Sequence, residues 1–183
     1  VIYDEASGHK QWINVRVECF AGRCGSNPGQ GYADGPKEDA RFDSPHGIDV
    51  TDDGRVFVAD TNNCLIRMID RFGHVTTIAG AVTTAELQQN GTQLEGCPHP
   101  CLSGLPGASD GSLGDSHFTY PSDVAYIPDQ DVILVTDRHR IRRIDLNLNS
   151  VTTVAGTSNE GMRDGIGSES SFNNPASITV TGD

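Results

Sequence analysis

The sequence has few basic residues and no long apolar run. Lysine and arginine number 13 against 25 aspartate and glutamate residues, which gives a formal net charge of −12. No Lys or Arg lies between Arg71 and Arg138. A nucleic-acid surface needs cations against the phosphates, so this balance argues against one. No apolar stretch approaches the ~20 residues of a membrane-spanning helix, so no membrane span is predicted.

The composition that remains is that of a turn-rich domain. The chain has 183 residues, which suits a single domain, and 36% of them are hydrophobic, which is enough for a packed core. Glycine is abundant, at 21 residues. No apolar pattern with the 3.6-residue period of a helix stands out, so the sequence predicts an all-β protein.

An internal repeat organises the chain. An Asp-Gly pair is followed, at the same spacings each time, by a Phe and then a Pro. A closing Val-Thr-Thr-x-Ala-Gly segment ends two units, at Gly80 and Gly156, and residues 17–22 are a looser version. Equal spacings in three places make chance a poor explanation. The repeated positions are Asp34, Gly35, Phe42 and Pro45; Asp110, Gly111, Phe118 and Pro121; and Asp164, Gly165, Phe172 and Pro175.

Each unit predicts four short strands. The segments are rich in β-branched residues and are bounded by turn signals such as Asp52-Asp53-Gly54. A repeated four-stranded unit of this length is typical of a β-propeller blade. The expected strands are 47–50, 56–60, 65–70 and 75–79; then 123–126, 132–137, 140–146 and 151–155; and finally 177–180.

Several segments resemble the NHL repeat. They are Tyr32-Ala-Asp-Gly35, Pro45-His-Gly-Ile48, Val56-Phe-Val-Ala-Asp-Thr-Asn62, Ile66-Arg67 and Val75-Thr-Thr-Ile-Ala-Gly80. The resemblance implies a β-propeller of four-stranded NHL-type blades, of which this chain holds about three blades' worth. The organisation expected is trailing strands of a blade in 1–22, an NHL blade in 23–80, an inserted inter-blade loop in 81–108, a second NHL blade in 109–156, and the leading part of a further blade in 157–183.

A propeller closes with about four to eight blades, so these units cannot close a ring by themselves. One interpretation is that the remainder of a longer chain completes the propeller. The other is that neighbouring copies do so, with the strand near Ser177 of one copy pairing with residues 1–22 of the next; such a head-to-tail contact builds a ring or a filament.

The repeated side chains have structural interpretations. Phe42, Phe118 and Phe172 are expected to fill the space between adjacent blades, and the three Asp-Gly pairs are expected to form turns. Calcium is a weaker alternative, because the sequence lacks a 12-residue loop with alternating acidic residues and a terminal Glu. We therefore expect no cofactor.

The cysteines and one sequon favour an extracellular or cell-surface protein. Cys19 with Cys24, and Cys97 with Cys101, are close pairs that an oxidising compartment would join, although pairing across loops stays open. A metal site in Cys97-Pro-His-Pro-Cys101 is the weaker interpretation. Cys64 is then left over as a small buried residue. The sequon at Asn90 predicts an N-glycan.

A cluster of cations and one histidine form the candidate contact surface: His46, Arg138 and Arg140. Arg138 to Arg143 contains four arginines, but Arg142 matches Arg67 of the other unit, and Asp131, Asp137 and Asp145 are near enough in sequence to pair with the run. His46 precedes the innermost strand, where a propeller's channel would open. Some relatives of this family hold zinc with histidines there, but only His46 is so placed.

The function expected is therefore that of a non-catalytic, extracellular protein-binding or structural and assembly module. No nucleophile or phosphate-binding motif is recognisable. One alternative is a propeller enzyme, a channel-sited lyase or hydrolase with its catalytic residues outside this segment. The second alternative is an RNA-binding NHL propeller, which the acidic composition disfavours.

Overall fold

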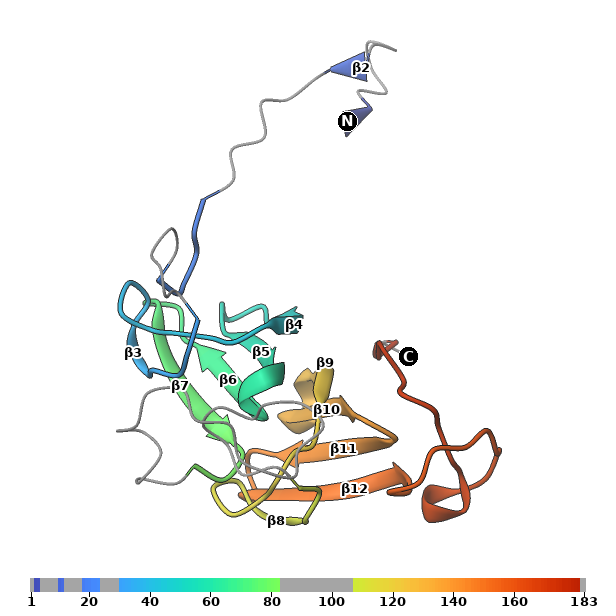
Figure 1. The fold of residues 1–183 in the computed structure, drawn as a ribbon. Helices are drawn as coiled ribbons and strands as arrows, with labels where there is room; N and C mark the ends of the chain where they lie inside the picture. Colours follow the sequence, from blue (N-terminus) through green and yellow to red (C-terminus); the bar gives the residue numbers. More distant parts are fainter. Residues whose placement is uncertain (1, 4–9, 12–17, 24–29, 83–106, 182–183) are drawn as a thin grey trace.

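The computed structural model describes all residues except 1, 4–9, 12–17, 24–29, 83–106 and 182–183. Two antiparallel five-stranded sheets dominate it (Figure 1). The described residues contain three short 3-10 turns but no α-helix, and therefore no helix that could cross a bilayer. The all-β prediction is confirmed.

The first sheet has the strand order β3-β7-β6-β5-β4 and the second the order β8-β12-β11-β10-β9. A separate antiparallel pair, β1 with β2, lies near the N-terminus. The strands of the first sheet are β3 Gly35–Pro36, β4 Pro45–Val50, β5 Val56–Asp60, β6 Leu65–Ile69 and β7 His74–Ala79. Those of the second are β8 Gly111–Ser112, β9 Pro121–Ile127, β10 Val132–Asp137, β11 Arg140–Asp145 and β12 Ser150–Gly156. The remaining elements are β1 Ile2–Tyr3, β2 Lys10–Gln11 and the 3-10 turns η1 Thr61–Asn63, η2 Pro128–Gln130 and η3 Gly167–Glu169.

The expected strands of both units form as predicted, within one or two residues at each end. The expected strand 177–180 does not, because none of the described residues supplies it with a ladder partner. Ser177 and Ile178 are held instead by the Asp123 carboxylate, at 2.6 Å from the hydroxyl and 3.0 Å from the N–H.

Each sheet has a fifth strand that the repeat did not predict. Gly35 and Gly111, expected in turns, lie in the two-residue edge strands β3 and β8, which pair with β7 and β12. The expectation that the Asp-Gly pairs simply form turns is therefore wrong for these two units. The acidic residue before each glycine is fixed by side-chain bonds, described below.

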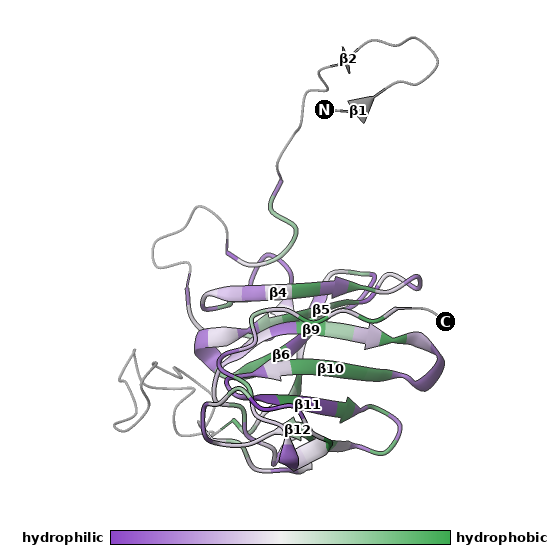
Figure 2. Cartoon of the chain, turned by 90° about the vertical axis from the view of Figure 1, so that its right-hand side faces the viewer, coloured by the Kyte–Doolittle hydropathy of each residue, from purple (hydrophilic) through white to green (hydrophobic). Residues whose placement is uncertain are grey.

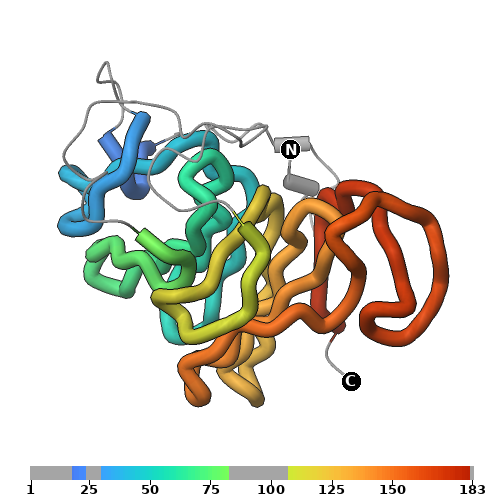
Figure 3. The backbone as a smooth tube through the Cα atoms, turned by 60° about the horizontal axis from the view of Figure 1, so that its bottom comes forward, coloured from blue at the N-terminus to red at the C-terminus, as the bar shows by residue number. Residues whose placement is uncertain are grey.

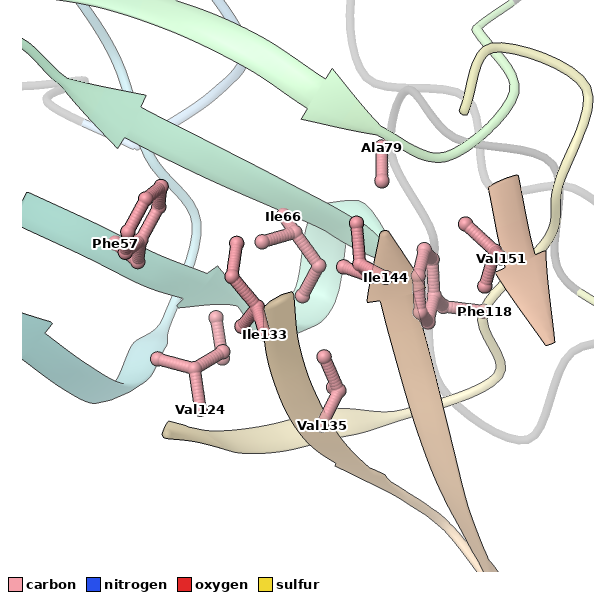
Figure 4. Close-up of a cluster of buried hydrophobic side chains, with 10 residues drawn as sticks. Phe57, Ile66, Ala79, Phe118, Val124, Ile133, Val135, Ile144 and Val151 are labelled. Atoms are coloured by element: carbon pink, nitrogen blue, oxygen red, sulfur yellow. The ribbon is translucent and has the colours of Figure 1, made fainter. Parts of the chain in front are cut away.

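The main core lies between the two sheets. Phe57, Ile66 and Ala79 of the first sheet face Ile133 and Ile144 of the second in one buried cluster (Figure 4). Phe118 lies in the same cluster and is fully buried, at the inter-sheet place that the repeat predicted for it. Its counterpart Phe42 packs against a second cluster within the first sheet. Figure 2 shows that β10 is mostly hydrophobic, whereas the turns around it are hydrophilic.

The inner strands of the sheets approach closely. At Gly47 a side chain would overlap the backbone of Asp123, so only glycine fits there. Nearby, the Tyr126 N–H donates to the Asp49 carboxylate at 2.7 Å. Arg55 bridges the sheets by donating to the Tyr126 hydroxyl at 2.8 Å. These contacts fix one sheet against the next.

Residues 157–181 begin a third unit beside the second sheet (Figure 3). The Gly156 N–H donates to the Ser170 hydroxyl at 3.1 Å, and Arg163 pairs with Ser171 in an isolated bridge. The same bridge joins Ala33 and Arg41 in the first unit. Repeats therefore follow one another side by side in chain order.

Candidate functional site

The segment around the repeated proline in each unit contributes to one pocket of about 540 Å³. The three contributing segments are equivalent in the repeat, because each contains or adjoins its conserved-spacing proline. Hydrogen bonds between units hold them together: Thr61 donates to the Pro121 carbonyl at 2.7 Å, and Ser122 to the Pro175 carbonyl at 3.1 Å. The lining residues are His46, Gly47, Tyr120, Ser122, Asp123, Arg138, Asn174, Pro175 and Ala176.

Arg138 reaches this pocket because its turn is short. The connection between β10 and β11 contains only Arg138 and His139, whereas residues 61–64 connect β5 to β6. Arg138 adopts the left-handed region, with φ 56°, and its N–H donates to the Tyr120 carbonyl at 3.2 Å. The shorter turn noticed in the sequence therefore presents a cation at the pocket.

Arg138 is the arginine among the residues that line this pocket. His46 is exposed and lies edge-on to the Tyr120 ring, with centroids 6.0 Å apart. The nearby Asp123 carboxylate already accepts from Ser177 and Ile178. The structure thus brings together two of the three predicted contact residues; Arg140, which begins β11, does not line the pocket.

Away from the pocket, each sheet contains a fully buried arginine. The Arg67 guanidinium donates to the Asp60 carboxylate at 2.7 Å, to Asp34 at 2.5 Å, and to the carbonyls of Ala33 and Arg41 at 2.8 and 3.1 Å. It also lies 5.0 Å from the Phe42 ring centroid. Carbonyls, carboxylates and an aromatic face together compensate the burial of the charge.

Arg142 repeats this arrangement in the second sheet. It donates to Asp137 at 3.1 Å, to Asp110 at 3.0 Å, and to the carbonyls of Ser109 and His117, both at 2.9 Å. Its guanidinium carbon lies 5.2 Å from the Phe118 centroid. We call this set, an Asp, two carbonyls and a Phe ring around a guanidinium, the arginine cradle.

The second cradle and one ion pair account for two of the four arginines in the basic run. Arg142 is buried, and Arg143 pairs with Asp145 at 2.7 Å. The ion pairing expected from the sequence is therefore present for these two arginines. A continuous basic surface, which RNA binding would use, does not form from this run.

Burial also changes the protonation of the inner carboxylates. It raises the pKa of Asp60 to about 6, against the lowering effect of the Arg67 charge and of hydrogen bonds from Asn63, Asp43 and Arg67. Burial likewise raises the pKa of Asp137. Both carboxylates belong to the packing of the sheets, away from the pocket lining.

Sequence reasoning missed the cradle because the groups around each arginine come from segments far apart in the sequence. The Ala33 carbonyl and the Asp34 carboxylate meet Arg67 only when the sheet has formed. The register shifts beside each arginine, between Ile66 and Arg67 and between Ile141 and Arg142, place the extra residue on the neighbouring strands β7 and β12. The available signal was that an arginine recurs at this place in both units.

The outer acidic residues serve this arrangement. Asp34 and Asp110 each also accept from the N–H of a threonine on β7 or β12, Thr77 and Thr153, both at 3.0 Å. Their carboxylates are thus engaged by protein donors. Within the part of the chain that the structure describes, no group of three or more His, Cys, Asp or Glu side chains could hold a metal ion.

Two cysteines lie within the described residues, and both are disulfide-bonded: Cys19 and Cys64. The expectation that Cys64 stays unpaired is wrong, although it is buried as expected, with 1% exposed. Cys24, Cys97 and Cys101 lie outside the described residues, as does Asn90, so the connectivity and the glycan stay predictions.

Repeated antiparallel sheets set side by side, with equivalent inner strands meeting at one pocket, define a β-propeller-like fold. Residues 42–67 match the NHL repeat, so the resemblance predicted from the motifs is confirmed and the chain carries an NHL repeat.

Known proteins share parts of this chain. A protein of unknown function from Bacteroides thetaiotaomicron superimposes with a TM-score of 0.54 at 20% identity, over 70% of this chain and 28% of its own. An auxiliary nutrient binding protein of the same species gives 0.46 at 18% identity, over 82% and 31%. Protein SUPPRESSOR OF QUENCHING 1, chloroplastic, of Arabidopsis thaliana is 52% identical over 40 residues, 22% of this chain and 4% of its own. The chain thus spans less than a third of each, and the structural likeness shows the fold alone.

Proposed function

We propose that this chain is a non-catalytic binding module that recognises a protein partner at the pocket around His46 and Arg138. The observation that carries the proposal is the convergence of equivalent segments from three units on one pocket of about 540 Å³. A rigid sheet scaffold that presents variable turns at one place is well suited to recognition.

The chemistry of the pocket favours an acidic group of the partner. Arg138 is half-buried, and its side chain donates from Nε to the His139 ring at 3.3 Å. The terminal nitrogens are the atoms that recognise a carboxylate in two-pronged fashion. Tyr120 and His46 add ring surface and polar atoms beside it. A carboxylate side chain on an exposed loop of the partner fits this set.

An extracellular location remains part of the proposal. It is supported by the two disulfide-bonded cysteines and by the sequon at Asn90. Intact-mass measurement of the protein secreted from eukaryotic cells, before and after removal of N-glycans, tests it. An unglycosylated product whose cysteines are free thiols in the native state would contradict this location.

The binding proposal is tested by NMR titration of the isotope-labelled chain with three probes. These are a tetraglutamate peptide with blocked termini, the matching tetralysine peptide and a single-stranded uridine oligonucleotide. We expect shifts of the amides of His46, Tyr120 and Asn174 with tetraglutamate only. The Arg138→Gln variant should weaken that binding at least fivefold, and the matched charge control Arg71→Gln, on a distant exposed turn, should not.

Other outcomes decide against the proposal. Shifts with the oligonucleotide that weaken as salt is added would favour the RNA-binding alternative. Equal effects of Arg138→Gln and Arg71→Gln would show that the peptide responds to overall charge and not to the pocket.

A further inference from the structure

The pocket around His46 and Arg138 has room for more than the carboxylate that the proposed function assigns to it. Its volume is about 540 Å³, and pockets that hold whole small molecules have volumes of about 300–1,000 Å³. A carboxylate held by Arg138 fills only a small part of this space. The rest of the lining therefore indicates what accompanies the acidic group of the partner.

Two neutral polar side chains of the lining have partners within the protein. The Ser122 hydroxyl donates to the Pro175 carbonyl at 3.1 Å, and the Asn174 side-chain amide donates to the Asn173 side chain at 3.1 Å. These bonds hold the second and third units together and fix the rim of the pocket. A group that lies beside the carboxylate gains little from hydrogen bonds that these side chains already make within the protein.

The lining also limits the ligand to one acidic group. Asp123 belongs to the lining, and its carboxylate accepts from the Ser177 hydroxyl at 2.6 Å and from the Ile178 N–H at 3.0 Å. A second anionic group of the ligand would lie near this like charge, and the two charges would repel each other. The pocket therefore favours one acid next to an uncharged group.

The remaining walls are rings and small apolar groups. They are supplied by His46, Gly47, Tyr120, Pro175 and Ala176. The rings of His46 and Tyr120 meet edge to face, with centroids 6.0 Å apart and an angle of 72° between the planes. Aromatic rings favour this arrangement and the offset stack, so a further ring can pack against such a pair.

We propose that the pocket binds two adjacent residues of the protein partner, an acidic residue at Arg138 and an aromatic residue against Tyr120 and His46. This inference rests on the proposed function, which supplies the carboxylate at Arg138. An acidic residue alone would leave the rings uncovered. Aromatic residues that enter pockets contribute much of the binding energy at protein interfaces, so the ring adds affinity as well as selectivity.

The test is an NMR titration of the isotope-labelled chain with four blocked dipeptides. They are acetyl-Glu-Phe-amide, acetyl-Glu-Ala-amide, acetyl-Gln-Phe-amide and acetyl-Glu-cyclohexylalanine-amide. We expect the Glu-Phe peptide to shift the amides of His46, Tyr120 and Asn174, and to bind at least fivefold more tightly than the Glu-Ala and Gln-Phe peptides. The cyclohexyl peptide keeps the apolar bulk without the aromatic face, and it should bind at least twofold more weakly than the Glu-Phe peptide.

Protein variants assign the two preferences to different residues. Tyr120→Leu should reduce the preference for Glu-Phe over Glu-Ala to less than twofold, and Arg138→Gln should do the same to the preference for Glu-Phe over Gln-Phe. His46→Ala changes an exposed ring, so it tests the ring preference without altering a half-buried side chain; it should lower that preference at least twofold. The matched control His74→Ala, at an exposed histidine of β7 outside the lining, should preserve both preferences.

The outcomes separate this inference from the proposed function. If the Glu-Phe and Glu-Ala peptides shift the pocket amides with equal affinity, the pocket selects the acid alone: the inference is wrong and the proposed function stands. Equal binding of the cyclohexyl and Glu-Phe peptides would also overturn the inference, because the pocket would then select bulk and not an aromatic ring. If no glutamate peptide shifts these amides, both fail.

Discussion

Replacing Arg142 by methionine should strongly destabilise the chain. The change keeps an apolar stem of similar length but removes a guanidinium that is fully buried and makes bonds to Asp137, Asp110 and two carbonyls. It leaves the Asp137 carboxylate, also fully buried, without a cation. Removing one partner of a buried ion pair costs about 3–5 kcal/mol.

The matched control is Arg143→Met, at the next residue of β11, whose side chain lies on the opposite face of the strand. The Arg143 side chain is 30% exposed and makes one ion pair, with Asp145. Asp145 is buried but also accepts from the Leu148 N–H, so it keeps a donor when Arg143 is replaced, and we expect this pair to contribute about 1 kcal/mol. The predicted difference between the two variants is therefore about 3 kcal/mol, or roughly 6–12 °C in Tm for a chain of this size.

Urea unfolding followed by circular dichroism at pH 7.5 measures both variants, with the disulfides kept oxidised. The unfolding slope should stay the same, so that the shift in midpoint reports stability. If Arg142→Met loses no more than Arg143→Met, the buried network is not what stabilises the sheet, and the cradle argument fails with it.

Two further predictions follow from buried groups. Because burial raises the pKa of Asp60 to about 6, above the value of about 3.8 in the unfolded chain, the folded state binds this proton more tightly. The contribution of this proton to the free energy of unfolding is therefore full below pH 4 and is lost as pH rises through 6, by up to about 3 kcal/mol in all. Urea unfolding across this pH range should show a fall in stability that is smaller in Asp60→Asn. If the free energy of unfolding falls equally with pH in both proteins, the raised pKa of Asp60 is contradicted. Gly47→Ala should cost about 1–3 kcal/mol, because its Cβ would overlap Asp123, while Gly114→Ala, with open space around it, should cost almost nothing. Equal effects of the two alanines in thermal unfolding would show that the inner strands do not depend on this close approach.

The strands were predictable because their pattern is local. Each segment rich in β-branched residues is bounded by turn residues, which identifies it as a strand. Its recurrence at equal spacing is a second, independent signal. Phe118 was predictable for the same reason, since a recurrent large apolar residue outside the strands needs a place to be buried. Its place proved to be the cluster between the two sheets.

The role of the repeated aspartates was not predictable, because it depends on contacts far apart in sequence. Asp34 and Arg67 are joined only when β3 pairs with β7 and β7 pairs with β6. The Asp-Gly pair alone indicates a turn. Similarly, Arg138 and Arg140 look equivalent in the sequence, but only Arg138 occupies the turn that faces the pocket.

The arrangement separates the residues that stabilise the sheets from those that line the pocket. The cradle atoms lie on the ladder and on the segment before it, so the connection between β10 and β11 can lose two residues while Arg142 keeps its place. That shorter connection is what brings Arg138 to the pocket. Changes in turn length can therefore alter which side chains line the pocket with little effect on the buried network. The predicted insertion of 81–108 is a second example of a changed connection beside a preserved contact. It begins next to Gly80, whose N–H donates to the Leu113 carbonyl at 2.9 Å.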